Sequence, residues 1–305
     1  MHDIKRIYDQ VKETLSNHAQ QYFAFDENNQ FYPNKPSFSD LELVSLALTA
    51  ECVQIDSENY LWSKLQSDYK SDFLHLPHRT KFNKRRKRLS DVIAQCMAVF
   101  RDKLMTPSDL LIIDSMPIPT CCITREKSTK VCQSKTDSVI ARKGYHASSK
   151  TWYIGYKLHL ITTESGVYVD MLVTSANEHD NCFLKELSKD DSHLRERVLI
   201  GDRAYIGHAI QLSLFEELSL DIQVPFRINQ KDFSNYPPEL KIKRKTIETV
   251  FSQLCDEFMI KRNYAKSFSG LYSRIICKIA AKSFKQVWNR LHGNPINQTK
   301  HALAA

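Results

Sequence analysis

Two acidic residues stand directly after short apolar runs, Asp114 in Leu-Ile-Ile-Asp and Asp202 in Leu-Ile-Gly-Asp. Continuous apolar runs of this length are typical of buried strands, and ligands bind where the strands of an open α/β sheet end. If the two strands are neighbours, the two carboxylates lie close together and repel each other. A divalent cation relieves that repulsion, and Mg²⁺ prefers carboxylate oxygens. The pair therefore predicts a magnesium site.

A third carboxylate, Glu248, lies in a predicted amphipathic helix over residues 245–258. It stands opposite the apolar side of that helix and follows the basic residues Arg244 and Lys245. Three carboxylates can hold two metal ions about 3.5–4 Å apart, which activate the attacking oxygen and stabilise the leaving oxygen of a phosphodiester. Each acid alone also fits a helix cap or an ion pair, so the prediction depends on the set of three.

The elements that must position these acids begin near residue 106. Apolar and alternating patterns predict strands over 110–114, 152–163, 167–174, 197–202 and 220–226. Helices are expected over 180–187, 208–218 and 245–258, and a long helix closes the chain. This order predicts an α/β fold with a mixed sheet flanked by helices. Residues 115–151 read as a long basic loop, either functional or disordered.

Residues 1–105 read as all-helical, with a capping box at Ser39–Glu42. We therefore expect a helical DNA-binding region over 1–105, a catalytic domain over 106–292 and a disordered tail over 293–305. A helix-turn-helix over 39–65 is compatible with the pattern, although no firm signature of that motif is present.

The charge of the chain favours an anionic partner. Its formal net charge is +8, and basic residues cluster between Leu74 and Ser90, between Cys121 and Lys150, and just before Thr246. One such cluster alone fits a solvated surface, whereas three around one candidate site favour phosphate binding. The first cluster contains seven basic residues and no acidic one: Arg79, Lys81, Lys84, Arg85, Arg86, Lys87 and Arg88.

Five ordered motifs resemble the DDE transposases of bacterial insertion sequences, whose catalytic domain has the RNase H-like fold. The resemblance covers about residues 108–265 and places the leading acid at Asp114, the second acid at Asp202 and the helix acid at Glu248. The motifs are IIDSMPI, YIGYKLHLI with Gly155, Lys157 and His159, TSANEHD with His179 and Asp180, LIGDRAYIG with Tyr205, and RKTIETVFSQL with Arg244.

The N-terminal stretches IDSEN (55–59) and PHRTKFNKRR (77–86) resemble insertion-sequence group nine-eight-two. Two positions depart from related groups: Lys241 stands where they often carry a tyrosine three residues before the helix arginine, and Cys255 stands where they carry a basic residue seven after the glutamate. Lys261 and Arg262 lie further along. The second departure leaves the source of that phosphate contact open.

The resemblance implies a mechanism and a set of contacts. Water would cleave a phosphodiester at a transposon end, and the freed 3′-hydroxyl would attack a target strand, with two Mg²⁺ or Mn²⁺ ions held by the three acids. The partners would be double-stranded transposon ends and target DNA, bound by at least a dimer. The segment 79–88 would follow the DNA backbone. Phosphates near the scissile bond would contact Lys157, His159, Arg203, Arg244 and Lys245. His159 fits a core position in its strand equally well. Asp180 is expected to cap the helix that follows it.

Other classes of function remain to be separated. An RNase H-like nuclease without strand transfer would carry the same acids, and a catalytically silent DNA-binding protein would not need all three. No phosphate-binding G-x-x-x-x-G-K-[ST] motif exists, which disfavours a nucleotide hydrolase, and neither Cys121 nor Cys122 has a histidine partner motif. The absence of an 18-residue apolar run and of a secretory h-region, together with irregularly spaced cysteines, predicts a bacterial cytoplasmic protein associated with the nucleoid.

Overall fold

The computed structural model describes residues 3–303 except 108–109, 135, 148, 189, 226–235 and 263. The chain forms two compact units. Unit 1 comprises Met1–Leu104, Gln253–Tyr264 and Ser269–Ala305, and unit 2 comprises Met105–Ser252 and Ala265–Phe268. The last helix, expected within a catalytic domain over 106–292, belongs from Ser269 on to the same unit as the N-terminal helices.

Unit 1 is helical, and its helices bury one another's apolar faces. The Ser39 side chain accepts from the Glu42 backbone N–H and the Glu42 side chain accepts from that of Ser39, so the predicted capping box is present. The helices of this unit are α1 (Ile4–Ala19), α2 (Asp40–Cys52), α3 (Glu58–Asp68), α4 (Arg79–Arg88), α5 (Ser90–Leu104) and most of α9 (Phe268–Leu291).

The end of the chain packs onto unit 1 as far as the structure describes it. Thr299 begins a short 3-10 helix, η5 (Thr299–His301), and its hydroxyl donates to the Glu257 carboxylate at 2.9 Å. Thr299, Ala302 and Leu303 are buried. The expectation of a disordered tail over 293–305 is therefore wrong for residues 293–303, because polar and apolar contacts with distant residues order this segment.

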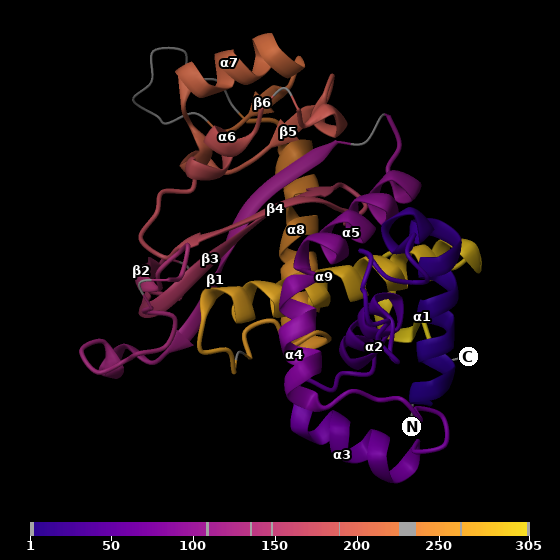
Figure 1. Cartoon of the computed structure of the whole chain (residues 1–305). Coiled ribbons are helices and arrows are strands. Elements are labelled where there is room, and N and C mark those ends of the chain that lie inside the picture. The colour runs from indigo at the N-terminus through magenta and orange to yellow at the C-terminus, as the bar shows by residue number, and fades with distance from the viewer. Residues whose placement is uncertain are drawn as a thin grey trace. The chain divides into compact units, whose positions relative to one another are not determined.

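Unit 2 is built on a six-stranded mixed sheet (Figure 1). β3 pairs antiparallel with β1 on one edge, and with β2 and then β4 on the other; β1, β5 and β6 follow in parallel. The predicted class, a mixed sheet flanked by helices with a helical N-terminal region, is confirmed. The strands are β1 (Leu111–Cys121), β2 (Arg142–His146), β3 (Thr151–Thr163), β4 (Tyr168–Ser175), β5 (Val198–Ile200) and β6 (Asp221–Gln223).

The first strand is longer than predicted. β1 continues seven residues past Asp114, through Pro117 and Pro119, which normally argue against a central strand. Among the described residues, only Leu111 and Ile112 of β1 pair with β5, and no other strand pairs with that side of β1. A missing N–H on that side costs no ladder hydrogen bond. The expectation of one long loop over 115–151 is therefore wrong, since β1 and β2 occupy both of its ends.

Helices cover the sheet of unit 2. α6 (Cys182–Glu186) and α7 (His208–Leu218) lie beside β5 and β6 in Figure 1, and α8 (Pro238–Asp256) buries Ile247 and Val250. Most of α8 belongs to unit 2, and its last residues, from Gln253 on, belong to unit 1. One core cluster joins strands and helices through Leu111, Ile113, Ile161, Val169, Phe183, Leu184, Leu187, Leu194, Leu199, Tyr205, Leu214, Leu218 and Leu220.

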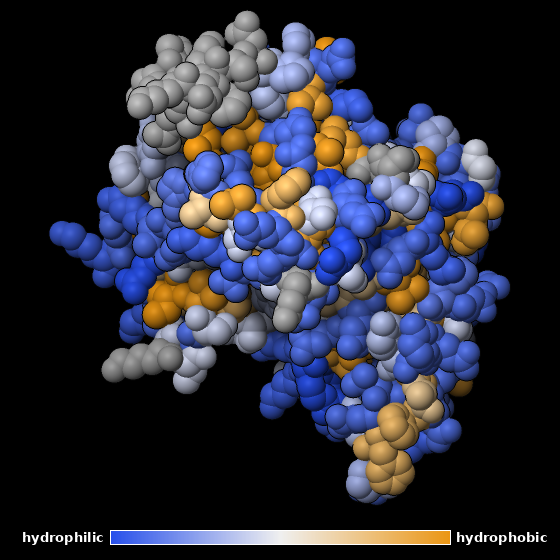
Figure 2. All heavy atoms as spheres, turned by 90° about the horizontal axis from the view of Figure 1, so that it is seen from above, coloured by the Kyte–Doolittle hydropathy of each residue, from blue (hydrophilic) through white to orange (hydrophobic). Residues whose placement is uncertain are grey.

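The surface drawn in Figure 2 is mostly hydrophilic, with hydrophobic residues in separate patches. Within the described residues, no helix is long and apolar enough to cross a membrane. All eight cysteines are free thiols.

Candidate active site

The parallel pairing of β1 with β5 brings Asp114 and Asp202 to the same level. Leu111 pairs with Leu199 and Ile112 with Ile200, and each acid lies two residues beyond the second pair. The backbone of Asp202 remains extended, at φ −90° and ψ −177°. Because side chains alternate along extended chains, both acids project from the same face of the sheet. The expectation that the two strands are neighbours is confirmed.

Gly201 allows this close approach of the two strands. A Cβ placed on it would lie 2.9 Å from Cγ2 of Ile113 and 3.1 Å from the ring of Tyr205. Asp202 then accepts a hydrogen bond from the backbone N–H of Ala204 at 2.8 Å and so caps the short 3-10 helix η4 (Arg203–Tyr205). The glycine and the cap together fix where the second acid points.

The surroundings of Asp114 disfavour the ionised form of its carboxyl group. Burial raises the pKa of its carboxyl to about 7, the backbone N–H of Ser115 at 2.8 Å opposes that rise, and the negative charge of Asp202 adds to it. Arg244 lowers the pKa and Asp180 raises it, and both effects are weaker than the first three. The guanidinium of Arg244 stays 4.0 Å from the carboxylate, beyond hydrogen-bond reach.

Tyr205 lies close to the same acids. Its ring is buried, and its hydroxyl has no hydrogen-bond partner among the described residues. Burial raises the pKa of that hydroxyl well above its ordinary value, and the charges of Asp114, Asp180 and Asp202 raise it further. Three carboxylates and an unsatisfied buried hydroxyl thus share one small region. The sequence carried Tyr205 only as part of a motif and gave no role for it.

Asp180 holds a separate group of side chains in place. Its Oδ1 accepts from Ser115 Oγ at 2.9 Å and from Lys157 Nζ at 3.2 Å. The expectation that Asp180 caps the next helix is wrong, because Asn181 is the residue before α6 and no side chain caps that helix. The carboxylate instead faces the sheet, where Lys157 supplies its counter-charge.

His159 is a core residue of β3. It is fully buried, its Nε2 lies 2.9 Å from Thr174 Oγ1, and its Nδ1 lies 3.9 Å from Asp180. Burial lowers the pKa of its imidazole to about 4, although Asp180 opposes that shift. His159 is therefore covered by protein, which favours the core position over the phosphate contact, and its burial disfavours the charged form.

Glu248 lies on the exposed side of α8, while its neighbour Ile247 is buried. Arg244 is one helical turn earlier and therefore on the same side of the helix, facing Asp114. The ligand atoms of Asp114, Asp202 and Glu248 do not all come within 4.8 Å of one another. α8 also begins at Pro238, seven residues before the predicted start.

The family of the chain follows from its sequence over this unit. A family model described as the transposase DDE domain matches residues 105–267, which is more than half of the 305 residues. The chain belongs to the DDE transposase family. No curated protein matches it. A piggyBac transposase, solved by cryo-electron microscopy as a synaptic complex with hairpin DNA, is similar at 11% identity and a TM-score of 0.48, covering 100% of this chain and 79% of that one.

Two arginines of α4 that were predicted to contact DNA bind protein groups of unit 1 instead. Arg86 is 5% exposed and pairs with Glu58 at 2.9 Å. Arg85 bonds the backbone carbonyl of Phe38 and the carboxylate of Asp40, at 2.7 and 2.6 Å. The structure therefore corrects both assignments, since these arginines hold the helices together. Of the other predicted contacts, the exposed ones are Lys81, Lys84, Arg88, Arg203 and Lys245, while Arg79, Lys157 and Arg244 are partly buried.

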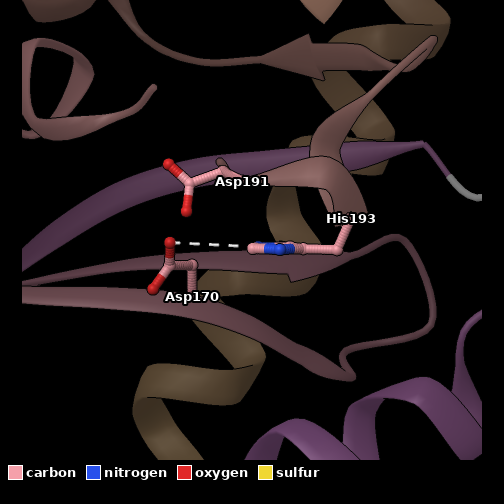
Figure 3. Close-up of side chains that lie close together, drawn as sticks. All are labelled: Asp170, Asp191 and His193. Atoms are coloured by element: carbon pink, nitrogen blue, oxygen red, sulfur yellow. Dashed lines mark ion pairs between the residues drawn. The ribbon is translucent and has the colours of Figure 1, made fainter. Parts of the chain in front are cut away.

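A second cluster of metal-ligating side chains lies elsewhere in unit 2 of the transposase. Asp170 of β4 and the pair Asp191 and His193 bring their ligand atoms within 4.8 Å of one another (Figure 3). His193 Nε2 is 3.9 Å from Asp170 Oδ2. None of the three predicted acids belongs to this cluster, which sequence spacing alone does not reveal because β4 and residues 191–193 meet only in the fold.

Asp114 and Asp202 fit the divalent metal that this family uses. Both offer carboxylate oxygens, the donors preferred by Mg²⁺ and Mn²⁺. The raised pKa of the Asp114 carboxyl means that a cation there would relieve an existing electrostatic cost, and the unsatisfied hydroxyl of Tyr205 lies beside the same acids.

Proposed function

We propose that Asp114, Asp202 and Glu248 are the catalytic acids with which this transposase cleaves transposon ends and joins them to target DNA. The observation that carries the proposal is the level placement of Asp114 and Asp202 on adjacent parallel strands. Arg244, which faces Asp114 from α8, supports Glu248 as the third acid because the two residues share one side of that helix. From its resemblance to insertion-sequence group nine-eight-two, we also propose that the transposase belongs to an insertion sequence of that group.

In the proposed reaction, metal ions and protein side chains have different roles. Two Mg²⁺ or Mn²⁺ ions held by these carboxylates would supply Lewis-acid activation of the attacking and leaving oxygens. Asp114 and Asp202 would hold those ions from adjacent strands, and the capping bond from Ala204 N–H keeps Asp202 in place. Arg244 offers positive charge beside the acids for a bound phosphate.

The partners that we propose follow from the reaction. Cleavage and joining require transposon-end DNA and target DNA, and bringing two ends together requires at least a dimer. The exposed cations of α4 and of the region near Asp202 are suited to DNA phosphates. Since its substrate is chromosomal DNA, we place the protein at the bacterial nucleoid.

The test uses DNA that carries the gene's own flanking sequences. Purified protein is incubated with this DNA and Mg²⁺ or Mn²⁺, and nicked and joined products are mapped. We expect cleavage at a defined end that Glu248→Gln abolishes. Glu239→Gln, which neutralises an exposed acid on the same helix, is the matched control and leaves cleavage intact.

The outcomes separate the proposal from its alternatives. Cleavage without joined products would favour an RNase H-like nuclease that performs no strand transfer. DNA binding without cleavage in any variant would favour a silent DNA-binding protein. Equal cleavage by wild type and Glu248→Gln would exclude Glu248 as the third acid.

A further inference from the structure

Two large aromatic side chains lie next to each other on the exposed hairpin of β2 and β3. Tyr145 and Trp152 are opposite each other in the strand register, with ring centroids 5.0 Å apart and planes at 50°. They remain 47% and 56% exposed. In contrast, the ring of Trp62 is buried. Burial normally stabilises rings of this size, so an exposed aromatic pair indicates a binding surface.

The opposite face of the hairpin provides its packing. Gly144 lies so close to Ala176 that a Cβ on it would be 2.5 Å from the Ala176 carbonyl oxygen. Its register partner, Tyr153, is buried. Because side chains alternate along each strand, the face with Gly144 and Tyr153 anchors the hairpin and the face with Tyr145 and Trp152 points outward. The outward rings are therefore not required to hold the strands in place.

Positive charge surrounds the pair. Lys143 places its ammonium 5.3 Å from the centre of the Trp152 ring and 3.0 Å from the carboxylate of Glu126. The other acid of this segment, Asp137, is engaged by the backbone N–H groups of Ser134 and Phe268. The described basic residues of this segment are all exposed: Arg125, Lys127, Lys130, Arg142, Lys143 and Lys150.

Exposed rings flanked by cations match the chemistry of unpaired nucleotides. A base stacks on an aromatic face while lysines and arginines neutralise the adjacent phosphates. Inside a duplex, neighbouring bases cover each other's faces, so this mode of contact favours single strands. An apolar protein partner would not need the basic residues. By comparison, Phe215 of α7, which is also 56% exposed, has no cation stacked on it among the described residues.

We propose that Tyr145 and Trp152 form a stacking platform for unpaired DNA bases, with Lys143 contacting an adjacent phosphate. The inference rests on the proposed function, because strand cleavage exposes unpaired nucleotides, and it adds a second DNA contact distinct from the acids. Glu126 pairs with Lys143 in the free protein, so a phosphate would compete with that carboxylate. Binding therefore separates Lys143 from Glu126.

The experiment titrates the full-length protein with a short oligothymidine strand and follows tryptophan fluorescence and anisotropy of a labelled strand. We expect quenching that Trp152→Ala removes, with affinity weakened roughly 5- to 100-fold, the range of one stacked base. Trp152→Phe keeps most of the affinity because it keeps a ring. Phe215→Ala, an exposed ring on another element, is the matched control and changes neither signal.

Two charge variants distinguish stacking from simple attraction. Trp152→Ala leaves the salt dependence of binding unchanged, whereas Lys143→Gln reduces its slope by about 0.7, the contribution of one phosphate contact on a single strand. Glu126→Gln frees Lys143 and strengthens binding by roughly two- to fivefold, the worth of one exposed ion pair.

Three results would overturn the inference. Unchanged affinity and fluorescence in both Trp152→Ala and Tyr145→Ala would exclude the platform. An equal loss on a blunt duplex would exclude unpaired nucleotides as its target, and loss of self-association in place of DNA affinity would assign the rings to a protein partner. Quenching through Trp152 without end cleavage by wild-type protein would contradict the proposed function alone, whereas cleavage without any role for Trp152 would contradict the platform alone.

Discussion

Buried charges are treated differently in the two units of the chain. In unit 1 two of the buried acids have a close cation: Glu51 lies 2.5 Å from Lys278, and Asp40 lies 2.6 Å from Arg85. Asp40 also accepts from the Tyr32 hydroxyl at 2.9 Å. These pairs compensate for the cost of removing charges from water, and so they stabilise one arrangement of helices.

In unit 2, Asp114 and Asp202 lie close together without a cation at such short range among the described residues. Asp114 has its ion-pair partner Arg244 at 4.0 Å, and the charge of Asp202 raises its pKa further. Keeping two carboxylates together costs stability. This arrangement therefore indicates that the site binds a cation from outside the protein. Close counter-charges in unit 1 therefore indicate a structural role, whereas two neighbouring carboxylates without a close cation indicate a chemical one.

The largest expected effect comes from removing one of the uncompensated acids. Asp114→Asn or Asp202→Asn should reduce end cleavage by roughly 10³-fold or more, because metal activation supplies several kcal/mol of transition-state stabilisation. Product formation from labelled transposon-end DNA measures this loss. Activity within tenfold of wild type in either variant would contradict the assignment.

Breaking a compensated pair should affect folding and not chemistry. Lys278→Met leaves Glu51 buried without its cation and should lower the free energy of unfolding by about 3–5 kcal/mol. Urea denaturation measures the change. Adding Glu51→Leu to this variant should restore most of the stability, since an apolar pair needs no counter-charge. A single variant as stable as wild type would show that the pair contributes nothing.

The pH dependence of stability should reveal the raised pKa of Asp114. Its folded pKa of about 7 lies above its unfolded value of about 4, so the folded protein binds the proton more tightly. The stability of metal-free protein should therefore decrease by a few kcal/mol as pH rises from about 4 to about 7. Asp114→Asn should lack this component, and a pH profile identical to wild type would refute the shift.

A smaller effect is expected where the two strands approach each other. Gly201→Ala puts a methyl group 2.9 Å from Ile113 Cγ2 and should cost about 1–3 kcal/mol by overpacking. The displacement of Asp202 should also reduce cleavage per folded molecule. Thermal denaturation and cleavage assays on the same preparation check both effects; a fully stable and active variant would show that the backbone adjusts freely.

The sequence was sufficient to predict the elements that carry the acids, because apolar runs and alternation report burial locally. It could not predict that β1 runs on through Pro117 and Pro119, since this depends on which side of the strand lacks a neighbour. The burial of Arg86 and His159 likewise depends on distant partners, Glu58 and Asp180. Long-range pairing therefore decides which polar residues of a motif face solvent.

The central claim is that Asp114 and Asp202 hold the divalent ions. Isothermal titration of the DNA-free protein with Mn²⁺ tests it most directly, with Asp170→Asn as the matched variant at the other candidate cluster. We predict that Asp114→Asn and Asp202→Asn lose the binding heat and that Asp170→Asn retains it. Binding that survives in Asp114→Asn and disappears in Asp170→Asn would contradict the account and assign the metal to Asp170, Asp191 and His193.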